Sequence, residues 1–425
     1  MHPDSDPRRS VGPLAALMVA VTVGLVGRTL SVVAIPWFVL VTTGSAAQAG
    51  LVAAMVLLPG FVVGMIGGVW VDRLGYRRVS VASDLLAAVA TMLIPLLYAT
   101  VGLSFAVLLV LVFFGSLLDV PALTARRSMV PELAARAGMP LDRVNAWFES
   151  LQNLAFLIGT PLAGVLVAWL GARHVLWLDA GASALSALVV LVAVPATLFA
   201  KPEVAPRRYW EDVLVGLRFI RRDVVLWPMV IVLALSNATS VATVGVILPV
   251  YFQREFGSAA SLGFVLAATG GGAFLGATMY GAIVGRIRRR LIWNVAFLLA
   301  PLEFAIFLVS PSVALLAAVN FLVGFLLGPI NPIMVTLRHE RSPLEIRGRV
   351  FSTYSAIAMA AQPLGVLVTG NLVEGIGFDP TIVILTGAGL ALGVASLLIP
   401  GFRHMDDAPL VPAVVAPSPA PHPTG

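Results

Sequence analysis

The sequence contains no cysteine among its 425 residues, and this absence excludes disulfide bonds, thiolate nucleophiles and cysteine-ligated metal sites. It also lacks the Gly- and Lys-containing phosphate-binding loop, so the chain carries no motif for ATP hydrolysis. None of the five histidines lies deep within an apolar run, and no cluster of acids resembles a metal site. We therefore expect no metal, no cofactor and no enzymatic activity, because a membrane enzyme needs such groups within reach of one another.

Charge is scarce: charged residues make up 11% of the sequence, whereas soluble domains carry about 25%. Hydrophobic residues make up 59% and gather in runs of about 20 residues, the length of a membrane-crossing helix. The sequence therefore predicts an all-α membrane protein with twelve transmembrane helices. These runs lie near residues 13–41, 47–71, 79–100, 103–125, 142–169, 174–197, 224–252, 259–285, 291–310, 312–336, 350–373 and 380–400. The first run is too long for the core of a signal peptide, so we count it as a span.

The basic residues are distributed unevenly between the two sides of the predicted membrane helices. All 27 lysines and arginines except Arg28, Arg173 and Arg254 fall on the termini and on alternate connections. Basic connections stay in the cytoplasm, so we expect both termini to be cytoplasmic and the protein to be multi-pass. The net charge of +6 then reports topology, and nucleic acid is not expected as a partner.

An internal repeat divides the chain. An offset of 213 residues places GSAAQAGLVAA at 44–54 over GSAASLGFVLA at 257–267. Parallel repeats of this kind characterise a large class of transporters, in which the substrate site lies between the halves. We expect a cytoplasmic tail at 1–12, six-helix halves at 13–200 and 224–400, a cytoplasmic linker at 201–223, and a disordered Pro/Ala-rich tail at 401–425.

One polar motif, GGVWVDRLGYRR at 67–78, stands between the second and third runs. Topology accounts for its arginines but not for Asp72, because acids contribute little to orientation. The motif resembles the signature loop of the major facilitator superfamily, and a weaker copy follows the eighth run at Gly281 and Arg286. The matching residues are Gly68, Asp72, Arg73, Gly75, Arg77 and Arg78.

Within this superfamily the chain is similar to bacterial twelve-helix exporters related to the enterobactin and macrolide efflux proteins. The similarity rests on AIPWFVLVTTGS at 34–45, DRLGYRR at 72–78, ARRSMVPEL at 125–133 and RGRVFSTYSAIAMAAQPLG at 347–365. It implies a fold of two six-helix halves that work by alternating access. It also implies a latch in which Asp72 meets the start of the eleventh helix and holds the cytoplasmic side closed. Tyr76 departs from the family pattern, which usually has a basic residue there.

GTPLAG at 159–164 partly matches a motif that the family associates with antiporters, through Gly159, Pro161 and Gly164. The alternative is simple close packing, because small residues let membrane helices approach one another.

Arg28 lies in the middle of the first run, where an arginine costs about 2.5–3.5 kcal/mol, so it should face a cavity or an acid. Direct contact with substrate and a structural pair with Asp119 or Glu149 both stay open. Gln152, Asn153, Asn237 and Asn320 are further candidates for lining the cavity. Glu303 is ranked lower because its helix is peripheral in the family. Hydrated structural roles near the membrane edges are expected for Asp84, Asp179 and Glu374.

Intramembrane acids and the resemblance favour a secondary active transporter of the bacterial inner membrane. We expect proton-driven efflux of small amphipathic molecules such as drugs, antibiotics or siderophore-like compounds, performed by a monomer in the lipid bilayer. The alternatives are a proton-coupled importer and, from another class, an integral-membrane enzyme. The residues do not identify the substrate.

Overall fold

The computed structural model describes residues 10–195, 209–309 and 312–407, and for 61–74, 153, 156, 209 and 210 it describes the backbone only. Most of these residues are helical, and no strand occurs among them. Within the described ranges, eleven helical segments are long and apolar enough to cross a membrane. A further helix, Ala46–Leu74, stands between two of them and is apolar over Ala46–Gly60. The predicted all-α membrane fold is confirmed.

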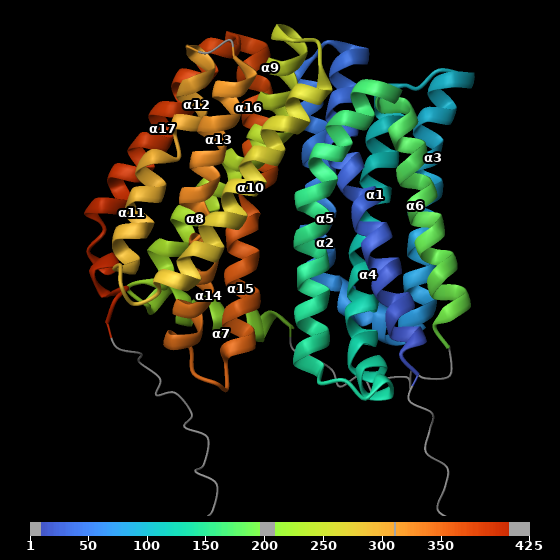
Figure 1. Ribbon diagram of the computed structural model, residues 1–425, viewed down its shortest axis with the longest axis horizontal. Coiled ribbons are helices and arrows are strands. Elements are labelled where there is room, and N and C mark those ends of the chain that lie inside the picture. Colours follow the sequence, from blue (N-terminus) through green and yellow to red (C-terminus); the bar gives the residue numbers. More distant parts are fainter. Residues whose placement is uncertain (1–9, 196–208, 310–311, 408–425) are drawn as a thin grey trace, which may run out of the picture.

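The first half is built from six uninterrupted helices, which form the right-hand body in Figure 1. They are α1 (Gly12–Thr43), α2 (Ala46–Leu74), α3 (Tyr76–Thr100), α4 (Phe105–Ala137), α5 (Leu141–Leu170) and α6 (Ala172–Ala193). Five of the six contain an internal proline and still continue through it. These helices pack mainly on one another, as α1 does on α5 and α6.

The second half has the same order of crossings, but four of its six spans are interrupted. The elements are α8 (Leu226–Ala242), the π-helical turn η2 (Thr243–Ile247), α9 (Leu248–Glu255), α10 (Ala259–Ile283), α11 (Arg289–Leu299), α12 (Leu302–Ala305), the 3-10 turn η3 (Ile306–Leu308), α13 (Val313–Leu327), α14 (Ile330–Arg341), α15 (Arg347–Ala360), α16 (Gln362–Ile376) and α17 (Phe378–Leu398). Pro301 and Pro329 lie at two of these breaks. A proline can interrupt a helix because it removes a backbone hydrogen bond and its ring clashes with the preceding turn.

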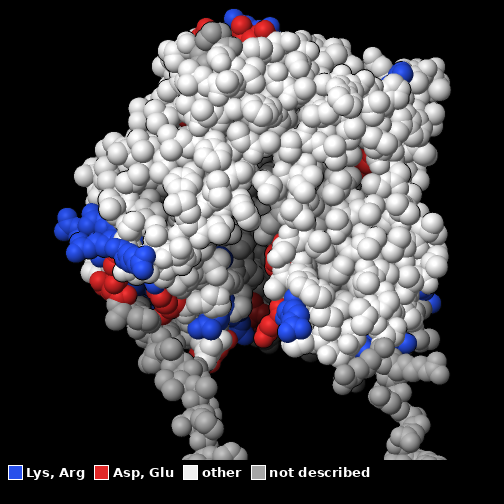
Figure 2. Space-filling view, viewed as in Figure 1, with Lys and Arg blue, Asp and Glu red and all other residues white. Residues whose placement is uncertain are grey.

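The blue start of α1 and the red end of the described chain lie at the same end of the bundle, here named the terminal end (Figure 1). At the opposite or far end the halves meet through glycines. A Cβ on Gly164 would stand 2.4 Å from the Cα of Gly263, which brings α5 against α10. A Cβ on Gly50 would stand 2.6 Å from the Val366 carbonyl oxygen, which brings α2 against α16. Figure 2 shows the surface hollowed between the halves toward the terminal end.

Part of the expected linker is a helix, α7 (Tyr209–Arg222), which packs on α15. Its Asp212 forms an ion pair with Arg349 at 2.7 Å, and Gly216 lies directly against Thr353. The 3-10 turn η4 (Pro400–His404) follows α17, and Phe402 and Met405 are completely buried. The last described residues therefore belong to the folded second half, while residues 408–425 of the expected tail lie outside the described chain.

Candidate substrate and coupling site

The signature loop joins α2 to α3. The side chains of Asp72 and Arg73, and the position of Gly68, fall in the part of α2 for which only the backbone is described, so the latch stays a prediction. Gly75 precedes α3 with φ 87°, a conformation that favours glycine. The Arg77 guanidinium donates to the Leu191 carbonyl near the end of α6, while Arg78 is exposed. Arg77 thus anchors the loop within the first half.

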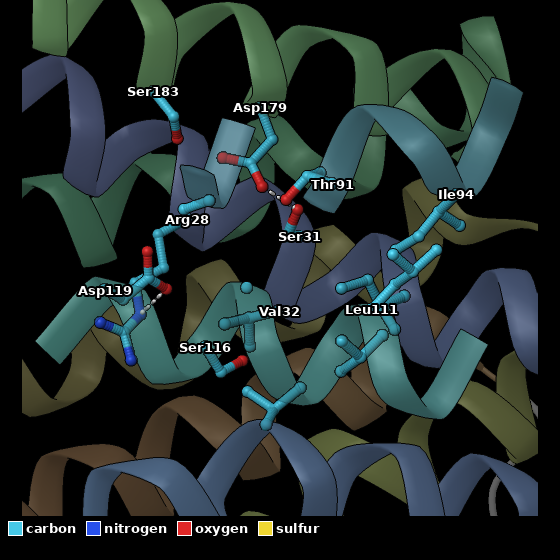
Figure 3. Close-up of a pocket in the computed structure, with 15 residues that line it drawn as sticks. Arg28, Ser31, Val32, Thr91, Ile94, Leu111, Ser116, Asp119, Asp179 and Ser183 are labelled. Atoms are coloured by element: carbon cyan, nitrogen blue, oxygen red, sulfur yellow. Dashed lines mark hydrogen bonds and ion pairs between the residues drawn. The ribbon is translucent and has the colours of Figure 1, made fainter. Parts of the chain in front are cut away.

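Arg28 on α1 pairs with Asp119 on α4, with 3.6 Å between Nε and Oδ2 (Figure 3). Both side chains remain accessible, at 39% and 29% exposure, so the pair stands at the wall of a cavity. The other predicted partner, Glu149, instead accepts from Arg127 at 2.7 Å. Of the two acids considered from the sequence, Asp119 is the one that meets Arg28.

Asp179 on α6 belongs to the same site, so its expected place in water at the membrane edge is wrong. It is buried and accepts a hydrogen bond from the Ser31 hydroxyl of α1 (Figure 3). Gly27 makes this approach possible, because a Cβ there would stand 2.8 Å from an Asp179 carboxylate oxygen. Asp179 lies eight residues into α6, about 10 Å along the helix. Its position in the sequence did not reveal that it points inward.

A second ion pair, between Asp84 on α3 and Arg126 on α4, lies closer to the terminal end. Both side chains are buried, and Arg126 also donates to Ser186 at 2.7 Å and to Ser80 at 3.2 Å. The expectation of a hydrated Asp84 is therefore wrong. Two small cavities of about 40 and 20 Å³, both lined by Arg28 and Asp119, extend from Asp179 to Arg126.

Two of the predicted amides have structural partners. Asn320 on α13 is buried, donates to the Leu316 carbonyl at 2.9 Å and accepts from Thr269 of α10 at 3.5 Å. Its role is therefore packing between α10 and α13, and its expected place in the cavity is corrected. Asn237 on α8 donates to the Ala358 carbonyl at 3.0 Å and also lines a cavity in the second half.

Gln152 and Asn153 follow Glu149 on α5. The amide nitrogen of Gln152 is buried and has no hydrogen-bond partner among the described residues. The side chain of Asn153 lies outside the described residues. No contact among the described residues brings Gln152 to the Arg28 and Asp119 pair.

The antiporter-like motif lies where α5 meets its neighbours. A Cβ on Gly159 would stand 2.9 Å from Thr29 of α1, and Gly164 touches Gly263 of the other half. Pro161 lies inside α5, and its carbonyl oxygen faces Gly263. The motif therefore acts as a close-packing surface, and one of its glycines belongs to the contact between the halves.

The protein family follows from the sequence as a whole. The family model described as Major Facilitator Superfamily matches residues 17–257 and 230–419. The chain belongs to the Major Facilitator Superfamily. This superfamily consists of membrane transporters, and the two six-helix halves have its architecture.

Several named relatives are similar over nearly the whole chain. The "Multidrug efflux pump Tap" of Mycolicibacterium fortuitum is 33% identical over 93% of this chain and 97% of its own length. The pump of the same name from Mycobacterium tuberculosis (strain ATCC 25618 / H37Rv) is 32% identical over 94% of this chain and 96% of its own. "Macrolide efflux protein A" of Streptococcus pyogenes is 21% identical over 90% and 95%.

Solved structures support the fold. The nucleoside transporter NupG superposes with a TM-score of 0.77 at 15% identity, covering 91% of this chain and 98% of that one. A bacterial homologue of the lysosomal transporter Spinster, described as inward-facing and unoccupied, superposes with a TM-score of 0.67 at 15% identity, covering 95% and 96%.

Proposed function

We propose that this protein exports small amphipathic molecules across the bacterial inner membrane, driven by protons and with both termini in the cytoplasm. The names of the relatives support efflux, and the one-sided distribution of basic residues supports the orientation. The observation that carries proton drive is the accessible Arg28 and Asp119 pair beside the buried Asp179. The lack of a nucleotide-binding motif in the chain agrees with a secondary transporter.

With both termini in the cytoplasm, as proposed, the described conformation corresponds to the inward-open state of an alternating-access cycle. The far end is closed where glycines let the backbones of the two halves touch. The Ser45 hydroxyl donates to the Glu374 carboxylate across the halves at 3.1 Å, and the Ala47 N–H donates to the same oxygen at 3.4 Å. Glu374 thus holds the start of α2, where free N–H groups favour an anion. Outward opening has to break these contacts.

Binding and release of a proton by Asp119 can break and restore its ion pair with Arg28. Their separation of 3.6 Å exceeds the about 2.7–2.9 Å of a tight charge-assisted hydrogen bond, so the pair is loose. A proton bound to Asp119 cancels its charge and releases Arg28, whereas loss of that proton restores the pair. The adjoining cavities of about 40 and 20 Å³ exceed the about 10–15 Å³ that one water molecule needs. Water there gives protons a route toward Asp84.

The proposal is tested in a bacterial host that lacks its own efflux pumps. Cells that express the protein should accumulate less of an amphipathic dye, and a proton uncoupler should abolish the difference with ATP depleted. Asp119→Asn should raise accumulation to the level of empty cells, while Asp142→Asn, an exposed acid on α5, serves as the control. Increased accumulation in expressing cells would indicate import, and uncoupler-resistant efflux would rule out proton drive.

A further inference from the structure

The second half contains a cavity of about 570 Å³, much larger than either cavity beside Arg28. Cavities that bind small molecules range over about 300–1,000 Å³, so its size suits a drug-sized ligand. It lies among α8, α11, α12, α13, α14 and α17. Ser240 and Asn331 are exposed and line it, so the cavity opens to the surface. Most of the remaining lining is apolar and includes Phe297 and Phe304.

Glu303 is the single charged residue among those that line this cavity. It stands on the short helix α12, directly after the break at Pro301, and is only partly exposed. No ion pair or hydrogen bond of its carboxylate occurs among the residues that the structure describes. An acid within a membrane-spanning segment is costly unless it has a partner, and Glu303 has none among the described residues.

Three acids within the helices of the first half differ from Glu303 in this respect. Asp119 has Arg28, Asp84 has Arg126, and Asp179 has the Ser31 hydroxyl. In the first half, the last helix, α6, packs closely on the first helix, α1, partly through Gly27. In the second half, the corresponding helices α17 and α8 make few contacts with each other. The looser packing leaves the space that the cavity fills. The first half thus supplies partners for these three acids, whereas the second half leaves Glu303 open to a ligand.

We propose that this cavity binds an amphipathic organic cation, with the cationic centre paired with Glu303. The apolar wall suits the lipophilic part of such a ligand. Ser236, Ser240 and Asn331 supply polar groups for orientation. The site provides no electrostatic attraction for an anion, because Glu303, the charged residue of the lining, is negative. The site deepens the proposed function, on which its role in transport rests, by naming the charge class of the substrate.

Two probes of similar shape and opposite charge test the site: tetraphenylphosphonium and tetraphenylborate. Their affinities are measured by equilibrium dialysis with the purified full chain in detergent. Glu303→Gln should weaken tetraphenylphosphonium binding at least about tenfold, as expected for a desolvated ion pair. Tetraphenylborate binding should stay the same or become tighter. Glu303→Asp should keep most of the cation affinity, and Asp142→Asn should bind both probes like the wild type.

Equal tetraphenylphosphonium affinity in the wild type and Glu303→Gln would overturn the proposal. Loss of binding of both probes in Glu303→Gln would overturn it too. If Glu303→Gln folds poorly, the Glu303→Asp variant carries the test, because a cation site requires it to retain charge selectivity. Charge-selective binding without any efflux of tetraphenylphosphonium from cells would contradict the proposed function and leave the site intact. Efflux of dyes without any Glu303-dependent binding would contradict the site and leave the proposed function intact.

Discussion

At the scale of single residues, neighbouring arginines on α4 have opposite surroundings. Arg126 forms a buried ion pair with Asp84, with side-chain exposures of 5% and 9%. Arg127, the next residue, forms an exposed pair with Glu149, at 52% and 58%. Removing one partner of a buried pair leaves an uncompensated charge, whereas an exposed pair is screened by solvent.

Arg126→Ala should therefore lower the free energy of unfolding by about 3–5 kcal/mol. Arg127→Ala is the matched control and should change it by less than about 1 kcal/mol. Thermal unfolding of both variants in detergent gives the comparison. The double variant with Asp84→Ala should recover part of the loss, because it removes the stranded acid as well. Equal stability of the two single variants would mean that the Asp84 pair has no structural role.

Arg28→Ala addresses the residue that the sequence singled out. Because the Arg28 and Asp119 side chains are partly exposed, the substitution should leave folded yield near that of the wild type. Efflux should fall at least about tenfold, because the charge that responds to the proton on Asp119 is gone. Yield is measured by size-exclusion chromatography and efflux by dye accumulation, with the exposed Arg143→Ala as control. Wild-type efflux in folded Arg28→Ala would remove this residue from the coupling site.

At the scale of helices, α5 approaches α10 and α2 approaches α16 at glycines, which have no side chain to hold the backbones apart. Gly164→Val would place side-chain atoms inside the backbone of α10, since even a Cβ there stands 2.4 Å from Gly263. The far end should then no longer close. Gly181→Val on α6 is the control, because a Cβ there meets nothing within 4 Å. We expect loss of transport in the first variant only.

The absence of cysteine makes the Glu374 contact directly testable. Cysteines introduced by Ser45→Cys and Glu374→Cys can be joined by a short thiol-reactive crosslinker, with no background thiols to remove. The crosslink should form readily and stop transport, because it fixes the far end in the closed conformation. Either single variant should be unaffected by the reagent. Full transport by the crosslinked protein would show that the far end does not open during the cycle.

At the scale of the whole molecule, the sequence predicted the architecture better than it predicted the site. Membrane helices follow from length and hydropathy, which are local properties, and the repeat at 44–54 and 257–267 indicated two halves. The direction of a side chain depends on packing instead. Depth along the helix therefore suggested a hydrated Asp179 and a cavity role for Asn320, although Asp179 points inward and Asn320 packs between helices.

The repeat also concealed a difference between the halves. The first half surrounds its acids with basic and hydroxyl partners, while breaks such as that at Pro301 let the second half keep a large cavity beside Glu303. Sequence similarity between the halves predicts shared topology but not shared chemistry, because a few prolines and glycines decide how closely the helices approach.

The central claim, proton-coupled transport through the Asp119 site, is tested most directly by proton movement in proteoliposomes. The purified protein is reconstituted with a pH-sensitive dye inside, and a gradient of an amphipathic substrate is imposed without any pH gradient. Downhill movement of substrate should drive protons the opposite way in the wild type, and Asp119→Asn should show no substrate-dependent pH change. Substrate movement without proton movement in the wild type, or undiminished coupling in Asp119→Asn, would contradict the account.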